Sequence, residues 1–264
     1  MFSTFGIVIE MSDLSKKTKK SKVMKKTLPL LLFVISAITT NAQAPNYDDL
    51  KILFADANYE KLTKVASNYT LKDELKKDPL PFIWLAKGLY KISLSGSTDE
   101  KFKNAYKDAI AALTKAMKND KEGSALSDHQ EFIDEFQGSL VELISNDLDA
   151  KDYNKASGWV IKYIKITKNP IGAKYLDGAS KYRKTDKGGA NTAWKEAETM
   201  LTKITTIEDW SDADKDMLKI GVFQSAECYI LSKQKEKAKT LLNKVAQWYE
   251  EDEDFKTKYD EIIN

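Results

Sequence analysis

The sequence has little of several residue types on which enzymes and disulfide-stabilised proteins depend. Its 264 residues include one cysteine, one histidine and one arginine, and glycine and proline are sparse at 11 and 5. A single cysteine cannot form an internal disulfide, so the fold must depend on its core. The single histidine, His129, excludes a multi-histidine metal centre. It follows Asp128 among polar residues at an expected helix start, which argues against a serine–histidine hydrolase, because that chemistry needs histidine together with partners.

The chain also lacks an apolar run long enough to cross a membrane, for which ~20 residues are needed. Its main apolar run, 28–38, follows a segment with seven lysines and precedes small and polar residues. This order is typical of a secretory signal peptide. We expect the signal peptide at 24–42, cleavage after Ala42, and an exported protein that is periplasmic or secreted. Residues 1–23 are then either a non-native upstream extension or a long basic n-region.

Removal of the export segment changes the charge balance of the chain. Of 42 basic and 40 acidic residues, seven and two fall in residues 1–42, which leaves 35 basic residues against 38 acidic ones. Non-specific nucleic-acid binding needs a basic surface, and specific readout of bases and phosphates favours arginine over lysine. Because the mature part is slightly acidic and holds only Arg183, we expect no nucleic-acid partner.

Apolar residues recur with a helical period through the rest of the chain, and the alternation typical of strands is missing. Asp78-Pro79 is typical of a helix start, in which an N-cap is followed by proline in the first turn. The pattern predicts an all-α fold in a single domain, 45–264. Its expected parts are helical pairs at about 47–67, 80–119, 127–168, 171–205 and 214–249, and a capping helix at 253–263.

Small residues recur at fixed distances from large apolar ones in these pairs. The pattern near the C-terminus reads Val222, Ser225-Ala226, Tyr229, Ala238, Leu242 and Val245, and an aromatic-x-x-Ala-x-x-x-apolar pattern begins at Tyr106, Tyr153 and Trp194. The spacing resembles the tetratricopeptide repeat. The resemblance implies stacked antiparallel hairpins that form a short α-solenoid. The second pair departs from the family spacing, which predicts a lengthened first helix and loop there.

The resemblance also implies a binding scaffold and no enzymatic reaction. We expect a concave groove, lined by the first helix of each pair, that holds a peptide or helix of a cell-envelope protein. The lysine-rich, arginine-poor composition is similar to that of exported proteins of the Bacteroidota. The residues expected to contact the partner are Trp84, Lys87, Tyr90, Lys91, Tyr175, Lys219 and Gln224.

Two alternative functions stay open at this point. One is a component of an outer-membrane or periplasmic assembly machine. The other is an all-helical carbohydrate-binding protein or enzyme, which would need acids and aromatic residues brought together from different hairpins. No cofactor is expected, because the sequence contains neither a phosphate-binding glycine loop nor a dinucleotide fingerprint.

The remaining reactive side chains have a structural interpretation. His129 is interpreted as a surface histidine, and Cys228 as a small buried apolar residue on a packed helix face. Asp212-x-Asp214-x-Asp216 resembles half of a calcium loop, but Met217 stands where that loop needs glycine. We interpret it as the first turn of a helix capped by Ser211 or Asp212, where acids are favoured by the helix dipole.

Overall fold

The computed structural model describes residues 46–264, and the predicted signal peptide and the segment before it lie outside the described residues. Residues 47–264 form one compact unit, which contains helices and no strand. The prediction of an all-α fold is therefore confirmed for this part of the chain. The α-helices are α2 (Asp48–Ala55), α3 (Tyr59–Thr70), α4 (Pro79–Leu94), α5 (Ala105–Asn119), α6 (Ser124–Ser127), α7 (Gln130–Asp149), α8 (Tyr153–Tyr163), α9 (Ile171–Arg183), α10 (Lys187–Leu201), α11 (Asp212–Leu231), α12 (Lys235–Ala246) and α13 (Glu253–Ile263).

Four of the helical pairs share one turn. In each, a residue with positive φ follows the first helix, and the next residue is the N-cap of the second helix. The N–H of this N-cap residue donates a hydrogen bond to the carbonyl five residues earlier, at 2.8–3.0 Å. This carbonyl lies in the last turn of the first helix, where carbonyls have no partner within the helix. The four positive-φ residues are Ala57, Lys151, Thr185 and Lys233, and none is glycine.

The pair α4–α5 is the exception, as its sequence spacing predicts. Its helices are joined by residues 95–104, which contain Gly96 in a left-handed conformation and the short 3₁₀ helix η2 (Glu100–Phe102). A second 3₁₀ helix, η1 (Asp73–Leu75), precedes α4. The start of α4 is as expected, since the Asp78 carboxylate accepts from the Leu80 N–H at 2.9 Å.

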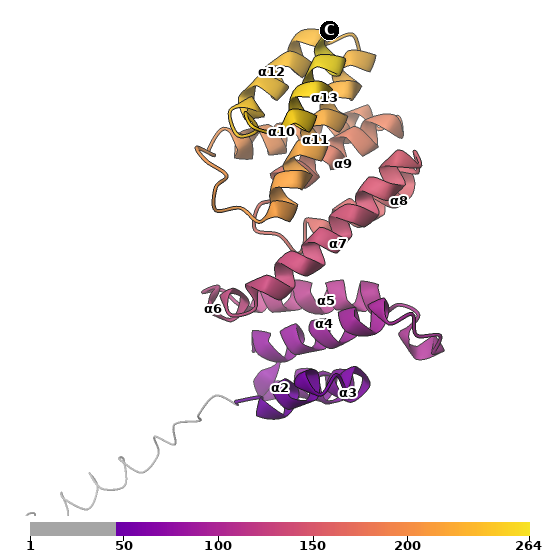
Figure 1. Cartoon of the computed structure of the whole chain (residues 1–264), viewed down its shortest axis with the longest axis vertical. Helices are drawn as coiled ribbons and strands as arrows, with labels where there is room; N and C mark the ends of the chain where they lie inside the picture. The colour runs from indigo at the N-terminus through magenta and orange to yellow at the C-terminus, as the bar shows by residue number, and fades with distance from the viewer. Residues whose placement is uncertain (1–45) are drawn as a thin grey trace, which may run out of the picture. The chain divides into compact units, whose positions relative to one another are not determined.

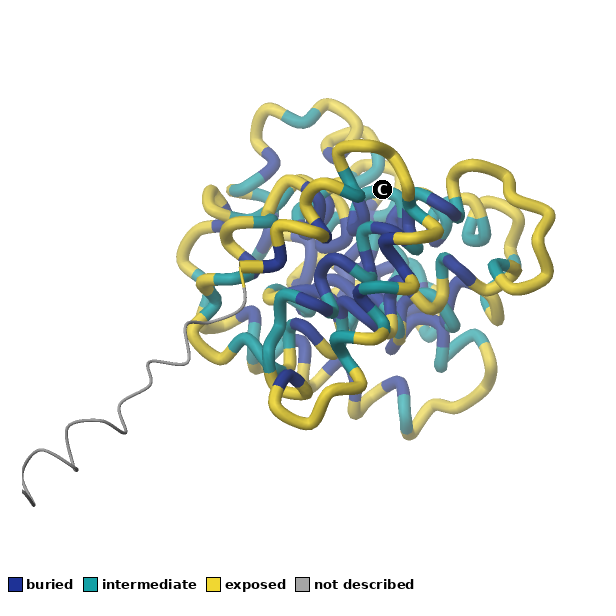
Figure 2. The backbone as a smooth tube through the Cα atoms, turned by 90° about the horizontal axis from the view of Figure 1, so that it is seen from below, coloured by how far each residue is buried: buried dark blue, intermediate teal, exposed yellow. Residues whose placement is uncertain are grey.

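The helices stack so that each hairpin covers part of the next. Helix α4 packs against both α3 and α5, and α9 packs against α8, α10 and α11, while α13 covers α11 and α12 (Figure 1). Buried residues line the inward faces of the helices, and the exposed ones gather in the connections (Figure 2). This packing is consistent with a helical solenoid, in which no hairpin can bury its apolar face alone. Among the described residues, no helix is both long and apolar enough to span a membrane.

Helices α9 and α11 approach each other too closely for a side chain at two positions. A Cβ atom on Gly172 would overlap backbone atoms of Met217 and Leu218, and one on Gly221 would overlap the carbonyl of Gly172. Without a Cβ, glycine permits this direct contact of two backbones. The two glycines therefore fix the distance between the fourth and fifth hairpins.

We predict that Gly221→Ala lowers the free energy of unfolding by ~3 kcal/mol or more, because a backbone atom cannot move aside as a flexible side chain can. Gly138→Ala is the matched control. Gly138 also lies inside a helix, α7, but a Cβ there would meet nothing within 4 Å. The control should raise stability by up to ~1 kcal/mol, since alanine is the better helix former. Urea unfolding of both variants tests this, and equal stabilities would contradict the close-contact account.

Candidate functional site

Four of the residues expected to contact a partner lie together where α4 meets α7. The Lys91 Nζ atom is 2.8 Å from Glu135 Oε1 across this seam. The Trp84 ring meets the ring of His129 edge-on, with centroids 5.2 Å apart. The Tyr90 ring packs on Phe136 at 4.6 Å. The four side chains thus join two hairpins of the stack.

Lys87, the fourth of them, has its ammonium group enclosed by aromatic rings. The Nζ atom lies 4.8 Å from the ring centre of Trp84, 5.2 Å from that of Phe54 and 5.6 Å from that of Phe132. It is also 3.1 Å from His129 Nδ1. Burial lowers the pKa of the Lys87 ammonium, while cation–π attraction favours its charged form. This aromatic box is occupied by the chain's own lysine.

The aromatic residues that we expected to line an open groove are buried in this structure. The exposed fractions of Trp84, Tyr90 and Tyr175 are 7%, 3% and 1%. Their rings fill the spaces between helices, so they cannot serve as surface anchors while the stack is intact. The interpretation of His129 as a surface histidine is wrong, because its ring is half-buried between Trp84 and Lys87.

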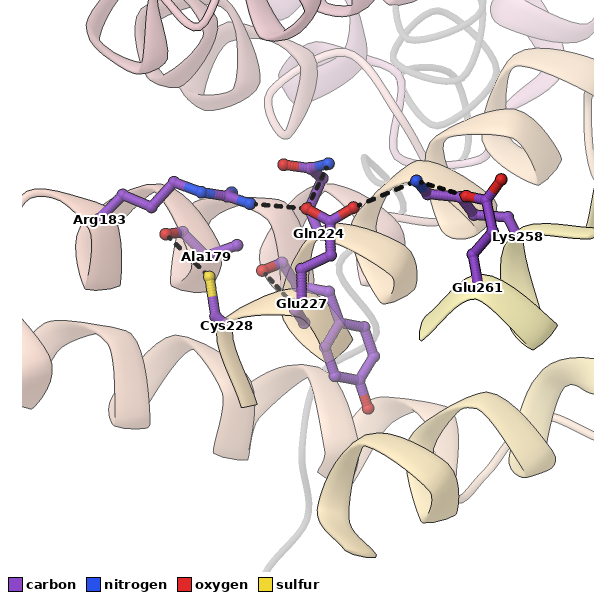
Figure 3. A network of polar contacts seen from close by, with 9 residues as sticks. Ala179, Arg183, Gln224, Glu227, Cys228, Lys258 and Glu261 are labelled. Atoms are coloured by element: carbon purple, nitrogen blue, oxygen red, sulfur yellow. Dashed lines mark hydrogen bonds and ion pairs between the residues drawn. The ribbon is translucent and has the colours of Figure 1, made fainter. Parts of the chain in front are cut away.

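The C-terminal members of the predicted set do not converge on one surface. Lys219 on α11 pairs with Asp252, the N-cap of α13, at 2.7 Å. The Gln224 amide donates a hydrogen bond to the Glu227 carboxylate. The same carboxylate forms an ion pair with the Arg183 guanidinium at 2.9 Å, and its other oxygen lies 3.6 Å from Lys258 Nζ (Figure 3). These contacts join α9, α11 and α13. The only arginine of the chain therefore has a structural partner.

Two other interpretations made from the sequence are confirmed. Cys228 is fully buried, its Sγ lies 3.8 Å from the Ala179 carbonyl (Figure 3), and burial raises the pKa of the thiol to about 11. Ser211 caps α11, because its hydroxyl accepts from the Asp214 N–H at 3.2 Å. Over the described part of the chain, no group of three histidine, cysteine or acidic side chains is arranged to hold a metal ion.

The structure forms a cleft between the second helices α10 and α12 that the sequence does not reveal. We call it the α10–α12 cleft, and its volume is about 420 Å³. Tyr229 is the partly exposed ring of its floor, and the rings of Tyr175 and Trp194, which are 1% and 6% exposed, are buried beside it. The Trp194 and Tyr229 rings lie 4.6 Å apart. The Trp194 indole N–H is held by Ser225 Oγ at 2.9 Å and by the Tyr175 carbonyl at 3.2 Å. The floor is therefore aromatic and rigid.

Charged side chains form the rim of the α10–α12 cleft. Glu198 accepts from the Tyr175 hydroxyl at 2.8 Å and pairs with Lys244, so that its carboxylate is already engaged. Lys195 on one wall and Lys237 on the other form no ion pair with any carboxylate that the structure describes, and the Lys237 Nζ is 6.0 Å from the Tyr229 ring centre. A ligand would thus meet an apolar floor between two available ammonium groups.

Little in the sequence marks the residues of this cleft. Lys195 and Lys237 stand among other lysines on the polar sides of two amphipathic helices, where lysine is ordinary. The one usable signal is their helical register. Asn191, Lys195 and Glu198 are spaced by four and three residues, and so share one face of α10. That this face lies opposite α12 follows only from the packing of the hairpins.

We predict that His129 lowers the free energy of unfolding as the pH decreases from about 6.5 to about 4. Burial, and the Lys87 ammonium beside it, lower the pKa of the folded-state imidazole from 6.5 to about 4. Above the unfolded pKa, both states are neutral and the stability is fully present. As the pH falls, the unfolded chain takes up the proton first, and stability is lost until the pH passes the folded pKa. Because the ring is partly exposed, we expect a loss of only ~1–2 kcal/mol.

The measurement is urea unfolding of the wild type and of His129→Gln near neutral pH and at about pH 4. Both proteins share all other titrating groups, so the difference between their pH dependences isolates His129. The variant should lose less stability than the wild type over this range. Equal losses would contradict the burial of a neutral imidazole.

Comparison with known proteins identifies no relative of this chain. No protein-family model matches it, and neither a curated protein sequence nor a solved structure does so. The resemblance to the tetratricopeptide repeat therefore stays a prediction from the sequence pattern. What the structure itself shows is an all-helical stack of hairpins.

Proposed function

We propose that the chain is a non-catalytic, exported scaffold of the tetratricopeptide-repeat type that binds a peptide segment of a cell-envelope protein, and that the α10–α12 cleft is its binding surface. The observation that carries this proposal is the partly exposed ring of Tyr229, supported by the buried Tyr175 and Trp194, between two lysines without an ion pair in an open cleft between stacked helices. Aromatic residues are favoured anchors at protein interfaces, and charges on the rim select and orient the partner.

The dimensions of the cleft favour a peptide. Its α10 wall extends from Asn191 to Glu198, which corresponds to ~10 Å of helix at 1.5 Å per residue. Three residues of an extended chain span a similar length, at ~3.3 Å each. One apolar side chain would contact the ring of Tyr229, and its neighbours along the peptide would reach the two walls.

The charges of the rim favour an acidic segment with an apolar residue. Since Glu198 is neutralised by Lys244, the groups left for a partner are Lys195, Lys237 and Glu236. Two ammonium groups against one carboxylate give a modest preference for acidic peptides. The attraction of such exposed charges is small for each pair and is screened by salt.

Affinity capture from the native envelope fraction tests the proposal, with residues 43–264 as bait at low and moderate salt. The cleft variant is Lys195→Glu/Lys237→Glu. The control variant, Lys203→Glu/Lys239→Glu, makes the same charge change at exposed lysines outside the cleft. We expect a partner that the wild type and the control retain at moderate salt, and that the cleft variant captures at least tenfold less, a difference of ~1.4 kcal/mol.

Two results would contradict the proposal. One is the absence of any protein captured at either salt concentration. The other is a partner that the cleft variant and the control variant retain equally well, which would place binding on another surface.

A further inference from the structure

A second, smaller cavity lies where α7 meets the connection after α8 and the connection before α11. We call it the Trp210 pocket, and its volume is about 250 Å³. The first half of α7 contributes Asp134 and Gln137, the segment after α8 contributes Asn169, and the segment before α11 contributes Trp210 and Ser211. Acids, amides and an aromatic ring from three separate segments of the chain are thus brought together. The cavity shares no residue with the α10–α12 cleft.

The floor of the Trp210 pocket contains a buried carboxylate. Asp214 is 4% exposed and accepts hydrogen bonds from the Tyr163 hydroxyl at 2.7 Å, the Thr167 hydroxyl at 2.6 Å and the Asn169 amide at 3.1 Å. Its pKa is raised by burial, against the effect of these donors. The hydrogen bonds hold the Asn169 side chain in a fixed position at the edge of the cavity.

A buried amide stands beside this carboxylate. Gln137 is 3% exposed, donates to the Ile166 carbonyl at 2.6 Å and accepts from the Ser211 hydroxyl at 3.2 Å. Burying an amide and a carboxylate costs free energy that well-packed apolar side chains would not cost. The fold therefore gains nothing in stability from this polar floor over an apolar one. The hydrogen bonds within the chain already hold the side chains of Asp214 and Gln137 in place before any ligand binds.

The walls of the pocket offer hydrogen-bonding groups that the fold leaves available. Asp134 is half-buried and is contacted by the Gln130 amide at 2.9 Å, whereas Asp209 is exposed. Neither forms an ion pair with any lysine that the structure describes. Lys168 adds a donor, and the half-buried Trp210 indole adds an apolar face. Hydrogen-bonding groups therefore surround a small space with one flat, apolar side.

We propose that the Trp210 pocket binds a single neutral sugar ring. A pyranose presents hydroxyl groups that both donate and accept around its edge, and C–H groups on its faces. Carboxylates accept from two hydroxyls at once, amides do both, and an indole covers the C–H face. The volume corresponds to ~8 liquid waters at ~30 Å³ each, which suits one ring and no larger glycan.

The lining excludes two other ligand classes. Three carboxylates, those of Asp134, Asp209 and Asp214, stand against the single ammonium of Lys168, so an anionic ligand would be repelled. An apolar ligand would leave the polar groups of the walls without water or partners. The site is independent of the proposed peptide binding, and either can fail without the other.

The test uses saturation-transfer NMR on residues 43–264 with glucose, galactose and N-acetylglucosamine as probes, each at up to ~10 mM, where millimolar dissociation constants are detected. Glucuronate is the anionic comparator. We expect saturable binding of at least one neutral sugar, and a dissociation constant at least tenfold higher in both Asp134→Ala and Trp210→Phe. Trp248→Phe is the matched control, since Trp248 is another half-buried tryptophan outside this cavity.

Circular dichroism and thermal unfolding establish that each variant is folded before binding is compared. Asp134→Ala removes no contact of the buried floor, and therefore separates ligand binding from a purely structural role of the junction. The proposal is overturned if no neutral sugar binds, if glucuronate binds as well as or better than the neutral sugars, or if the pocket variants bind as the wild type and Trp248→Phe do.

Discussion

The contact between Gly172 and Gly221 is the constraint on which the C-terminal half of the stack depends. Because the backbones of α9 and α11 touch there, the fourth and fifth hairpins lie closer together than side chains would allow. Their second helices, α10 and α12, flank this contact and form the walls of the α10–α12 cleft. The same α11 follows its N-cap Ser211 beside α7, and so brings the floor of the Trp210 pocket into place.

The N-terminal half is held by a different kind of contact. Between α4 and α7, aromatic side chains and the enclosed Lys87 ammonium fill the space between the helices. Between α9 and α11, by contrast, the glycines let the two backbones touch. Trp84, Tyr90 and the two lysines Lys87 and Lys91 are residue types typical of a binding surface. Here their side chains pack between two hairpins and hold them together.

The helical period in the sequence was sufficient to predict an all-α chain, and the Asp78-Pro79 start proved correct. The turns were not predictable, because Lys151, Thr185 and Lys233 adopt positive φ although left-handed backbone favours glycine. The close contact of α9 with α11 was not predicted either, because the pattern of small residues in the sequence drew attention to Ser225-Ala226 and to neither glycine of this contact. Ser225 and Ala226 are fully buried, but the backbones touch one turn earlier, at Gly221, whose partner is 49 positions away in the sequence.

The candidate sites were harder to predict for a physical reason. A helical pattern shows that Trp84, Tyr90 and Tyr175 face something apolar, but not whether that is a neighbouring helix or a partner protein. Conversely, Lys195 and Lys237 look like ordinary solvated lysines until packing places them on opposite walls of one cleft. For the Trp210 pocket, Asp214 was assigned correctly to a helix start, yet its burial depends on Tyr163 and Thr167 of another hairpin.

Peptide binding in the α10–α12 cleft is tested most directly by site-specific photocrosslinking in the native source. A photoreactive residue at Thr240, on the α12 wall, should form a covalent adduct with one partner protein. The same residue at Ser97, in the exposed α4–α5 connection, should form none. An adduct at Thr240 alone is the result that we predict, and adducts only at Ser97, or at neither position, would contradict the assignment of this cleft as the partner-binding surface.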